Sequence, residues 1–399
     1  MEDENIRKDF TSKFSDEKYK DFLNKLNSEI PSPIDYRIAE SPLFLNKDVS
    51  NKLIKCGEEI LDFLLRPDLK QITEKSIPDK WRCPNENDHS HFIGMDFALS
   101  KDKDGNFSPK LIEFQGFSGL YGIQAHLANA YKEIYNISDE WSIYRNGLDE
   151  TSYFNLLKQI IVGPYELDEV ILMDVHPHEQ HTAADFYFTK IHINIPIVGL
   201  EDLKQDGKKL FYEINGEKKY IKRIYNRLIF DEIDKDENIF EKNVDIRQDL
   251  DVEWITHPNW WYRISKYLLP HLKGDYILKS FILNDIINNL PNDLENYVLK
   301  PLFSFGGNNV IIDIKQDDIQ NIKDPQNWIL QQKAKYEPVM HIEGNDVIAE
   351  IRLMYFWPDK TQRPILTANN TRLSTGNMIN VGSNKNKKWA GATVTFMQK

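Results

Sequence analysis

The sequence is poor in cysteine and has no long apolar run. Only two cysteines, Cys56 and Cys83, occur among 399 residues, so a framework of disulfides is not expected. No apolar stretch approaches the roughly 20 residues that a membrane-spanning helix needs. The charged start MEDENIRKDF also lacks the apolar segment of a signal peptide. We therefore expect a soluble, cytoplasmic protein that does not bind membranes.

Positive charge is also in short supply. The chain has 50 Lys and Arg against 62 Asp and Glu, a net charge of −12, and no basic block. Binding to nucleic acid without sequence preference depends on such blocks, so we expect no nucleic acid as a partner. The length of 399 residues predicts two or three lobes.

Two familiar phosphate-binding motifs are missing. The segment VLKPLFSFGGNNVIIDI, residues 298–314, has a Gly-Gly pair but neither G-x-x-x-x-G-K-[ST] nor G-x-G-x-x-G, which both open a helix. Because β-branched residues follow the loop, the segment predicts a hairpin. Its tip is either an ordinary turn or a flap whose backbone N–H groups approach phosphates.

Periodicity divides the chain into four parts. Residues 1–80 have apolar residues at three- and four-residue spacing, which predicts a helical region. Residues 81–160 begin with a hairpin, HFIGMDFAL and KLIEFQG, around an Asp-Gly turn. Residues 161–255 alternate strand, helix and strand, which is typical of a small parallel α/β lobe. Residues 256–399 combine a helix over 260–272, the glycine hairpin and the apolar strand VIAEIRLMYFW.

Acidic and amide side chains face one another in the early hairpin. Asp96 lies in its first strand, and Glu113 and Gln115 share one face of the second. Opposed carboxylates repel unless a cation lies between them, and oxygen ligands of this kind suit Mg²⁺. The alternative is a solvated outer face.

Two lysines and a strand end add features expected of a nucleotide site. Lys266 lies in the predicted helix, and Lys300 ends the strand before the glycine loop. Both would neutralise phosphates, although a lone lysine is usually a surface residue. The strand in WILQQKAKYEP would offer edge backbone groups to an adenine, near Gln331 or Gln332; a plain strand end is an equally good interpretation.

The late apolar strand has charges on one face. Glu350 and Arg352 are two residues apart, so they point the same way and need partners. This favours either a site or a buried ion pair. Arg372 and Asn380 would extend the same polar floor.

Histidines cluster in HPHEQHTAAD, as His176, His178 and His181 beside Glu179. Such density suggests zinc, but the H-E-x-x-H spacing is absent. The segment follows a predicted strand and opens a helix, where α/β folds place ligand contacts. A zinc site, a substrate or nucleotide loop, and plain helix capping all remain open.

The order of these pieces resembles the circularly permuted ATP-grasp family, most nearly the synthetase half of glutathionylspermidine synthase and its uncharacterised relatives. The matches are MDF at 95–97, LIEFQG at 111–116, SK at 265–266, LKPLFSFGGNNV at 299–310, ILQQK at 329–333 and EIRL at 350–353. The resemblance as a whole covers roughly residues 75–399. The resemblance implies an α+β / α/β ATP-grasp fold, circularly permuted, with a pre-ATP-grasp-like α/β lobe and a separate N-terminal helical region.

The resemblance also implies a mechanism. ATP would phosphorylate a carboxylate of a small molecule or peptide, and an amine would attack the acyl phosphate to form an amide. Asp96, Glu113 and Gln115 would hold Mg²⁺, and Lys300 and Arg352 would be catalytic. The contacts to ATP would come from Lys266, Lys300, Ser304, Phe305, Gly306, Gly307, Asn308, Gln331, Gln332, Lys333 and Arg372.

Two positions depart from the pattern of the family. Gln115 stands where asparagine is typical, and Gly94 stands where an arginine typically steadies the tetrahedral intermediate. The candidates to take over the role of that arginine are Arg227, Arg263, Arg352 or Arg372. The leading hypothesis is thus an ATP-dependent carboxylate–amine ligase of unknown substrate. The alternatives are a non-ligating nucleotide-binding ATP-grasp protein and a zinc hydrolase using the cluster from His176 to His181.

Overall fold

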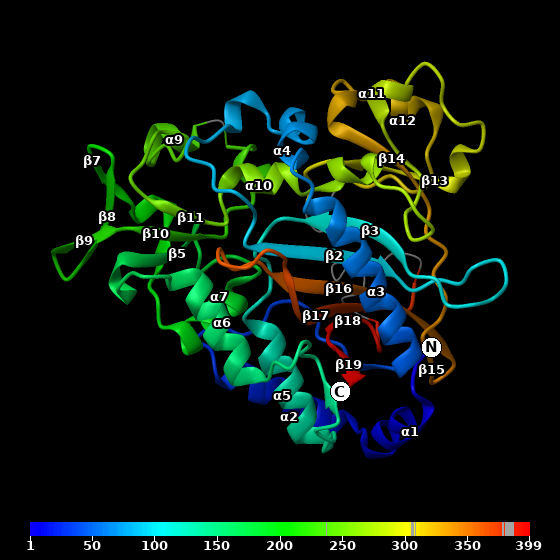
Figure 1. Cartoon of the computed structure of the whole chain (residues 1–399). Coiled ribbons are helices and arrows are strands. Elements are labelled where there is room, and N and C mark those ends of the chain that lie inside the picture. Colours follow the sequence, from blue (N-terminus) through cyan, green and yellow to red (C-terminus); the bar gives the residue numbers. More distant parts are fainter. Residues whose placement is uncertain (237, 305–306, 308, 377–378, 380–386) are drawn as a thin grey trace.

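A computed structural model describes the chain from residue 1 to 399, apart from 237, 305, 306, 308, 377, 378 and 380–386. The described residues form a mixed fold in which helices surround several β-sheets (Figure 1). The largest sheet has six strands in the order β18-β17-β16-β2-β3, with β15 paired to β16 outside this path. These strands are β2 (Phe92–Ala98), β3 (Lys110–Gln115), β15 (Met340–Ile342), β16 (Asn345–Phe356), β17 (Ile365–Ser374) and β18 (Gly391–Thr393). The early hairpin and the long late strand predicted from the sequence are both confirmed.

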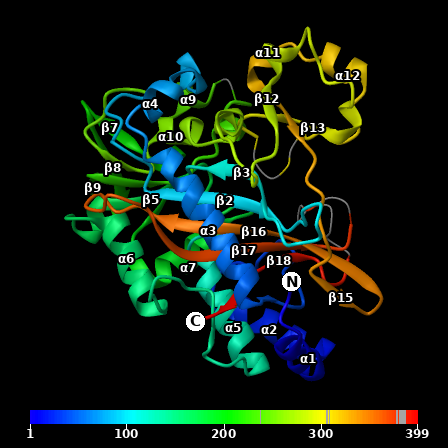
Figure 2. The same cartoon turned by 45° about the vertical axis from the view of Figure 1, so that its right-hand side comes forward.

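One face of this central sheet packs against the long helix α3 (Lys47–Leu64), which crosses it in both views (Figures 1 and 2). Successive residues of a strand point to opposite faces, and Ile93 and Met95 of β2 belong to the core beneath α3. Helix and sheet lie close together at Gly57, where a Cβ would lie 2.3 Å from the Tyr355 hydroxyl oxygen. Only glycine allows the helix to lie this close to β16.

The opposite face of the sheet is apolar at one end and polar in its middle. Phe92, Met354 and Ala368 share a buried core with residues of the helices at that end. The polar middle begins where Asp96 of β2 pairs with Arg352 of β16. The helices at the apolar end are α1 (Glu4–Lys13), α2 (Asp16–Ser28), α5 (Ile123–Tyr135), α6 (Glu150–Val162) and α7 (Ala183–Ile193). Because these helices cover only the apolar end, the polar middle is left to other elements.

The N-terminal part is mostly helical, as predicted, but it also contributes a strand. β1 (Leu43–Leu45) pairs in parallel with β19 (Thr395–Gln398), which in turn pairs with β4 (Trp141–Ser142). The two ends of the chain therefore meet in one small sheet. After α3 comes the short α4 (Leu69–Ile72). Within the described residues, no helix combines the length and apolarity needed to cross a membrane.

The middle of the chain forms the predicted parallel sheet, with strand order β11-β10-β5-β6. Between β6 and β10 the antiparallel sheet β7-β8-β9 projects at the left of Figure 1. The strands are β5 (Val170–Asp174), β6 (Ile197–Gly199), β7 (Lys204–Asp206), β8 (Lys209–Ile214), β9 (Glu217–Ile221), β10 (Arg223–Asn226) and β11 (Glu253–Ile255). Two short helices, α8 (Phe230–Ile233) and α9 (Ile239–Lys242), follow β10.

Another three-stranded sheet, β12-β14-β13, lies at the upper right of Figure 1 with α11 and α12. Its elements are β12 (Ser280–Ile282), α11 (Leu283–Ile286), β13 (Tyr297–Pro301), α12 (Gln316–Gln320) and β14 (Trp328–Gln332). It has a small core of its own around Leu283, Leu299 and Leu330. The lysine before the glycine loop lies at the end of β13.

Two predictions about this part were wrong in detail. The predicted helix 260–272 is broken into α10 (Pro258–Arg263) and a 3-10 turn, Lys266–His271. The break occurs because the Ser265 hydroxyl accepts a hydrogen bond from the Tyr267 N–H and starts a new turn. In the glycine hairpin, the second segment forms only an isolated bridge to Leu299, and the strand that pairs with β13 along its length is β14 instead.

A pair of histidines between helices, with His126 buried and His192 half-buried, predicts loss of stability in acid. His126 Nε2 lies 3.0 Å from His192 Nε2, and His126 Nδ1 lies 2.8 Å from a Glu29 carboxylate oxygen. Burial, and then the charge on His192, lower the pKa of His126 from 6.5 to about 4. The unfolded chain therefore binds a proton near pH 6.5 that the folded chain binds only near pH 4, so stability falls between these values as the pH falls.

Between pH 6.5 and pH 5, His126 should lower the free energy of unfolding by about 2 kcal/mol, at 1.36 kcal/mol per unit of pKa. Thermal unfolding at pH 7 and pH 5 would measure it. We expect His126→Gln to narrow the difference in Tm between the two pH values. The matched control is His341→Gln, because His341 is exposed on β15. An unchanged pH difference in His126→Gln would contradict this account.

Candidate functional site

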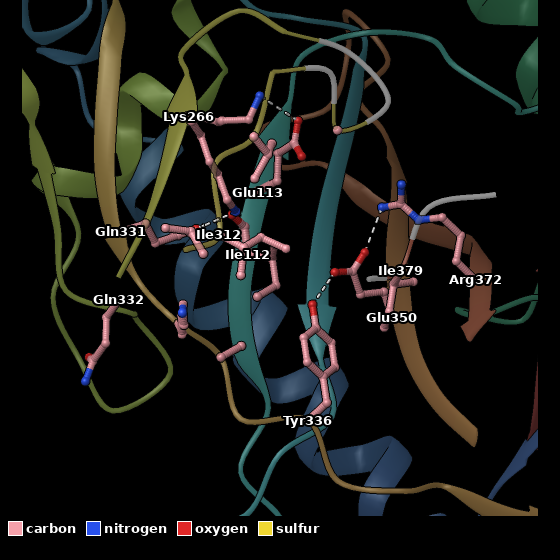
Figure 3. A pocket seen from close by; sticks show the side chains of 16 residues that line it. Ile112, Glu113, Lys266, Ile312, Gln331, Gln332, Tyr336, Glu350, Arg372 and Ile379 are labelled. Atoms are coloured by element: carbon pink, nitrogen blue, oxygen red, sulfur yellow. Dashed lines mark hydrogen bonds and ion pairs between the residues drawn. The ribbon is translucent and has the colours of Figure 1, made fainter. Parts of the chain in front are cut away.

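The polar middle of the central sheet forms the floor of a pocket of about 200 Å³ (Figure 3). The sheet β12-β14-β13 contributes the opposite wall through β13 and β14. Six charged side chains line it: Glu113, Lys266, Lys300, Lys333, Glu350 and Arg372. The other lining residues are Ile112, Val298, Gly307, Val310, Ile312, Gln331, Gln332, Ala334, Tyr336 and Ile379. Four cations against two carboxylates make this a pocket suited to an anion.

Strand register explains why the floor residues meet. Asp96 of β2 is paired with Glu113 of β3 on one side and with Arg352 of β16 on the other. Glu350 of β16 is paired with Arg372 of β17. Directly paired residues point to the same face, so residues more than 250 positions apart converge here.

The two predicted lysines both line the pocket. Lys300 Nζ donates a hydrogen bond of 2.7 Å to Gln331 Oε1. Lys266 Nζ donates to the Ser304 carbonyl oxygen at 2.9 Å and lies 3.2 Å from Glu113 Oε1. Burial lowers the pKa of Lys300 to about 8. A bound anion would restore the favourable interaction that this ammonium group loses on leaving water.

Asp96 binds two guanidinium groups. Its Oδ1 accepts from Arg352 Nε at 2.5 Å, and its Oδ2 accepts from Arg352 Nη2 at 2.7 Å and from Arg372 Nη2 at 2.6 Å. Burial alone would raise the pKa of Asp96, but Arg352 and then Arg372 hold it below its usual range. The carboxylate is 1% exposed and is not among the residues that line the pocket.

Glu350 is the second carboxylate of the pocket floor. It accepts a hydrogen bond from the Tyr336 hydroxyl and lies 3.0 Å from Arg372 Nη2 (Figure 3). Burial raises its pKa, and the Arg372 guanidinium opposes this shift. Tyr336 was not among the residues predicted from the sequence. Its position four residues after β14 placed it in a linker, and only the folded chain brings its hydroxyl to Glu350.

The predicted magnesium ligands differ in how well they fit a cation. Glu113 lines the pocket, and its Oε1 accepts a hydrogen bond of 3.4 Å from Gln115 Nε2 and lies 3.2 Å from Lys266 Nζ. Asp96 does not fit in this arrangement, because both of its oxygens already accept hydrogen bonds from arginines. Of the three predicted ligands, only the Glu113 carboxylate lines the pocket, and a carboxylate beside a phosphate site is a type of ligand that Mg²⁺ uses.

The predicted adenine contact needs a correction. β14 was expected to be an edge strand, but it lies between β12 and β13. The Gln332 N–H donates to the Lys279 carbonyl oxygen and the Lys333 N–H to the Asn296 carbonyl oxygen, so neither is left for a base. The side chain of Gln331 is also used, because it donates to the Ile112 carbonyl oxygen at 3.2 Å.

Some predicted site residues cannot be assessed. Phe305, Gly306, Asn308 and Asn380 lie outside the described residues. Of the glycine loop, Gly307 lines the pocket, and the Ser304 carbonyl oxygen binds Lys266.

Two of the four arginines considered as replacements at position 94 lie elsewhere. Arg227 pairs with Asp185 at 2.5 Å, and Arg263 pairs with Glu86 at 2.9 Å. Neither lines the pocket. Arg352 and Arg372 are therefore the guanidinium groups beside the site.

The histidine cluster does not form a zinc site. His176 Nδ1 lies 3.0 Å from Glu201, His178 Nδ1 lies 2.9 Å from the Tyr187 hydroxyl, and His181 contacts Asp35. In the part of the chain that the structure describes, no group of three or more His, Cys, Asp or Glu could hold a metal ion. Each histidine has a different partner, which removes the basis for a zinc hydrolase.

Comparison with known proteins supports the fold alone. No model of a protein family and no curated protein matches the sequence. Among solved structures, the chain is similar to a glutathione synthetase-like effector from Globodera pallida, determined in its apo form. The TM-score is 0.60 at 11% sequence identity, over 96% of this chain and 96% of that one. The chain thus has a mixed α/β fold similar to that of a glutathione synthetase-like protein.

Proposed function

We propose that this protein is an ATP-dependent carboxylate–amine ligase with a circularly permuted ATP-grasp fold. In this reaction a carboxylate takes the γ-phosphoryl group of ATP, and an amine then displaces phosphate from the acyl phosphate to leave an amide and ADP. The observation that carries the proposal is the convergence of Lys266, Lys300 and Arg372 with Glu113 in one pocket. Phosphoryl transfer depends mainly on positioning and on neutralising charge, which this set of side chains supplies.

Each residue has a role that follows from its contacts. Lys300 and Lys266 would bind phosphate oxygens, exchanging Gln331 and the Ser304 carbonyl for stronger, charged partners. Because Lys266 contacts both Ser304 and Glu113, it would hold the glycine loop over the pocket floor. Arg372 would face the reacting carboxylate or phosphate. Mg²⁺, when bound, would neutralise phosphate charge, and Glu113 would be its ligand at the pocket surface.

Binding calorimetry with a non-hydrolysable ATP analogue, with and without Mg²⁺, tests the nucleotide site. We expect binding that strengthens with Mg²⁺. Glu113→Ala should remove that dependence on Mg²⁺ and abolish ADP release, while circular dichroism shows an intact fold, because Glu113 lies at the pocket surface. Glu337→Ala is a matched control, since Glu337 lies outside the pocket lining. Absence of binding by the wild-type protein under both conditions would overturn the proposal.

A second candidate is a protein that binds nucleotide without ligating substrates. Position 94 favours it: the family to which the sequence is similar typically has an arginine there, and this chain has Gly94. The two candidates differ in turnover, since only a ligase releases ADP when offered a carboxylate and an amine. Analogue binding without ADP release across a panel of carboxylate–amine pairs would favour the second.

A further inference from the structure

A second cavity, of about 460 Å³, adjoins the start of the glycine loop at Phe303 and Ser304. We propose that this outer cavity binds a primary amine that carries an aromatic ring, in its ammonium form. The role of this ligand as the acceptor amine rests on the proposed ligase function, whereas its binding does not.

Five aromatic residues line the outer cavity: Trp81, Phe230, Tyr262, Phe303 and Trp328. The first three belong to the buried core of the parallel sheet. Phe303 and Trp328 are only half-buried, so part of each ring remains uncovered. Aromatic rings make favourable edge and offset contacts with another ring, and their faces attract cations. The wall of the outer cavity therefore suits an aromatic group that carries a positive charge.

The charged side chains of the outer cavity also favour a cation. Three carboxylates, Asp231, Asp234 and Asp324, stand against two ammonium groups, Lys80 and Lys235. This balance is the reverse of that in the pocket on the central sheet, where four cations stand against two carboxylates. The two cavities are thus suited to ligands of opposite charge.

The contacts of two of these carboxylates indicate a ligand with a single ammonium group. Asp234 Oδ1 accepts a hydrogen bond from Trp81 Nε1 at 3.0 Å and also pairs with Lys80. Asp324 Oδ1 accepts from Trp328 Nε1 at 3.2 Å. A polycation would have to displace these donors, whereas one ammonium group among aromatic rings would not.

Tyr262 supplies a polar group to receive the ammonium ion. It lines the outer cavity and is 3% exposed. Within the described residues its hydroxyl has no hydrogen-bond partner, which is uncommon for a buried polar group. Burial, and then the negative charge of Asp234, raise the pKa of Tyr262, and Asp231 adds to the shift. The same negative charges would stabilise an ammonium group that donates to the hydroxyl oxygen.

A small recess lies between the outer cavity and the pocket on the central sheet. It is lined by Glu113 and Lys266, which also line the pocket, and by Phe303 and Ser304, which also line the outer cavity. Lys266 Nζ donates to the Ser304 carbonyl oxygen at 2.9 Å at this junction. An amine in the outer cavity would therefore lie beside the place where the acyl phosphate of the proposed reaction forms.

Titration calorimetry without nucleotide tests the site with three probes: phenethylamine, phenylpropanoate and spermidine. We expect phenethylamine to bind, and the other two to bind at least about tenfold more weakly. Phenylpropanoate has the wrong charge, and spermidine lacks the ring. Absence of phenethylamine binding, or equal or tighter binding of either other probe, would overturn the proposal.

Two variants locate the bound amine. Tyr262→Phe removes a hydrogen bond to a charged group, and Trp328→Leu removes an aromatic face, so each should weaken phenethylamine binding about tenfold. The matched controls are Tyr220→Phe and Phe281→Leu, because neither residue lines the outer cavity, and both should bind as the wild-type protein does. Wild-type affinity in both Tyr262→Phe and Trp328→Leu would place the amine elsewhere and contradict the proposal.

Failure of the ligase proposal would look different. If the wild-type protein binds phenethylamine but no ATP analogue, the ligase proposal fails and the amine site stands.

Discussion

Lys300→Met should lower the affinity for a non-hydrolysable ATP analogue about 100-fold, which corresponds to roughly 2.7 kcal/mol for a charged hydrogen bond in a partly desolvated site. Lys300 ends β13, lines the pocket and has an uncharged partner, Gln331, at 2.7 Å. Its ammonium group is therefore available to a phosphate. Burial lowers the pKa of Lys300 to about 8, because it destabilises the charged form of the side chain. A bound phosphate would stabilise that charged form.

The same reasoning predicts that Lys300→Met keeps its fold. Removing a charge that burial disfavours should leave Tm unchanged or raise it slightly. Calorimetry gives the affinity, and thermal unfolding gives Tm. The matched control is Lys323→Met, because Lys323 is exposed and lies outside the pocket lining. Unchanged affinity in Lys300→Met would remove this lysine from the nucleotide site.

Asp185→Ala should lower the free energy of unfolding by about 3–5 kcal/mol, the usual cost of leaving a buried charge without its partner. Asp185 is fully buried, at 0% exposure, and its Oδ2 accepts from Arg227 Nη1 at 2.5 Å. Its Oδ1 accepts from the N–H groups of Gly122 and Ile123 at 2.6 and 3.0 Å. One side chain thus neutralises Arg227 and binds the start of α5.

Chemical denaturation followed by circular dichroism would measure this loss. Asp68→Ala is the appropriate comparison, because Asp68 also pairs with an arginine, Arg66, at 2.6 Å, but on the surface. Exposed ion pairs contribute little, so this variant should unfold at nearly the wild-type denaturant concentration. Equal effects of the two substitutions would contradict the importance of burial at Asp185.

Patterns over short stretches of sequence were enough to predict most elements. The β2–β3 hairpin, the parallel strands β5 and β6, and β16 were predicted correctly, because alternation and β-branched residues report local burial. The break before Lys266 was missed, since a serine cap competes with helix periodicity over only two residues. The full partner of β13 was also missed. β14 follows it after 26 intervening residues, and local patterns do not specify pairing at that distance.

The sequence by itself determined which residue types the site contains: lysines 266 and 300, the acidic early hairpin, and a late strand with Glu350 and Arg352 on one face. It also showed that this strand needed partners for its charges. Only the tertiary structure decided which residues those partners are. Asp96 and Arg352 are 256 residues apart, and strand register brings them together. Register depends on the packing of the whole sheet, so whether a carboxylate faces an arginine or the pocket is a property of the fold.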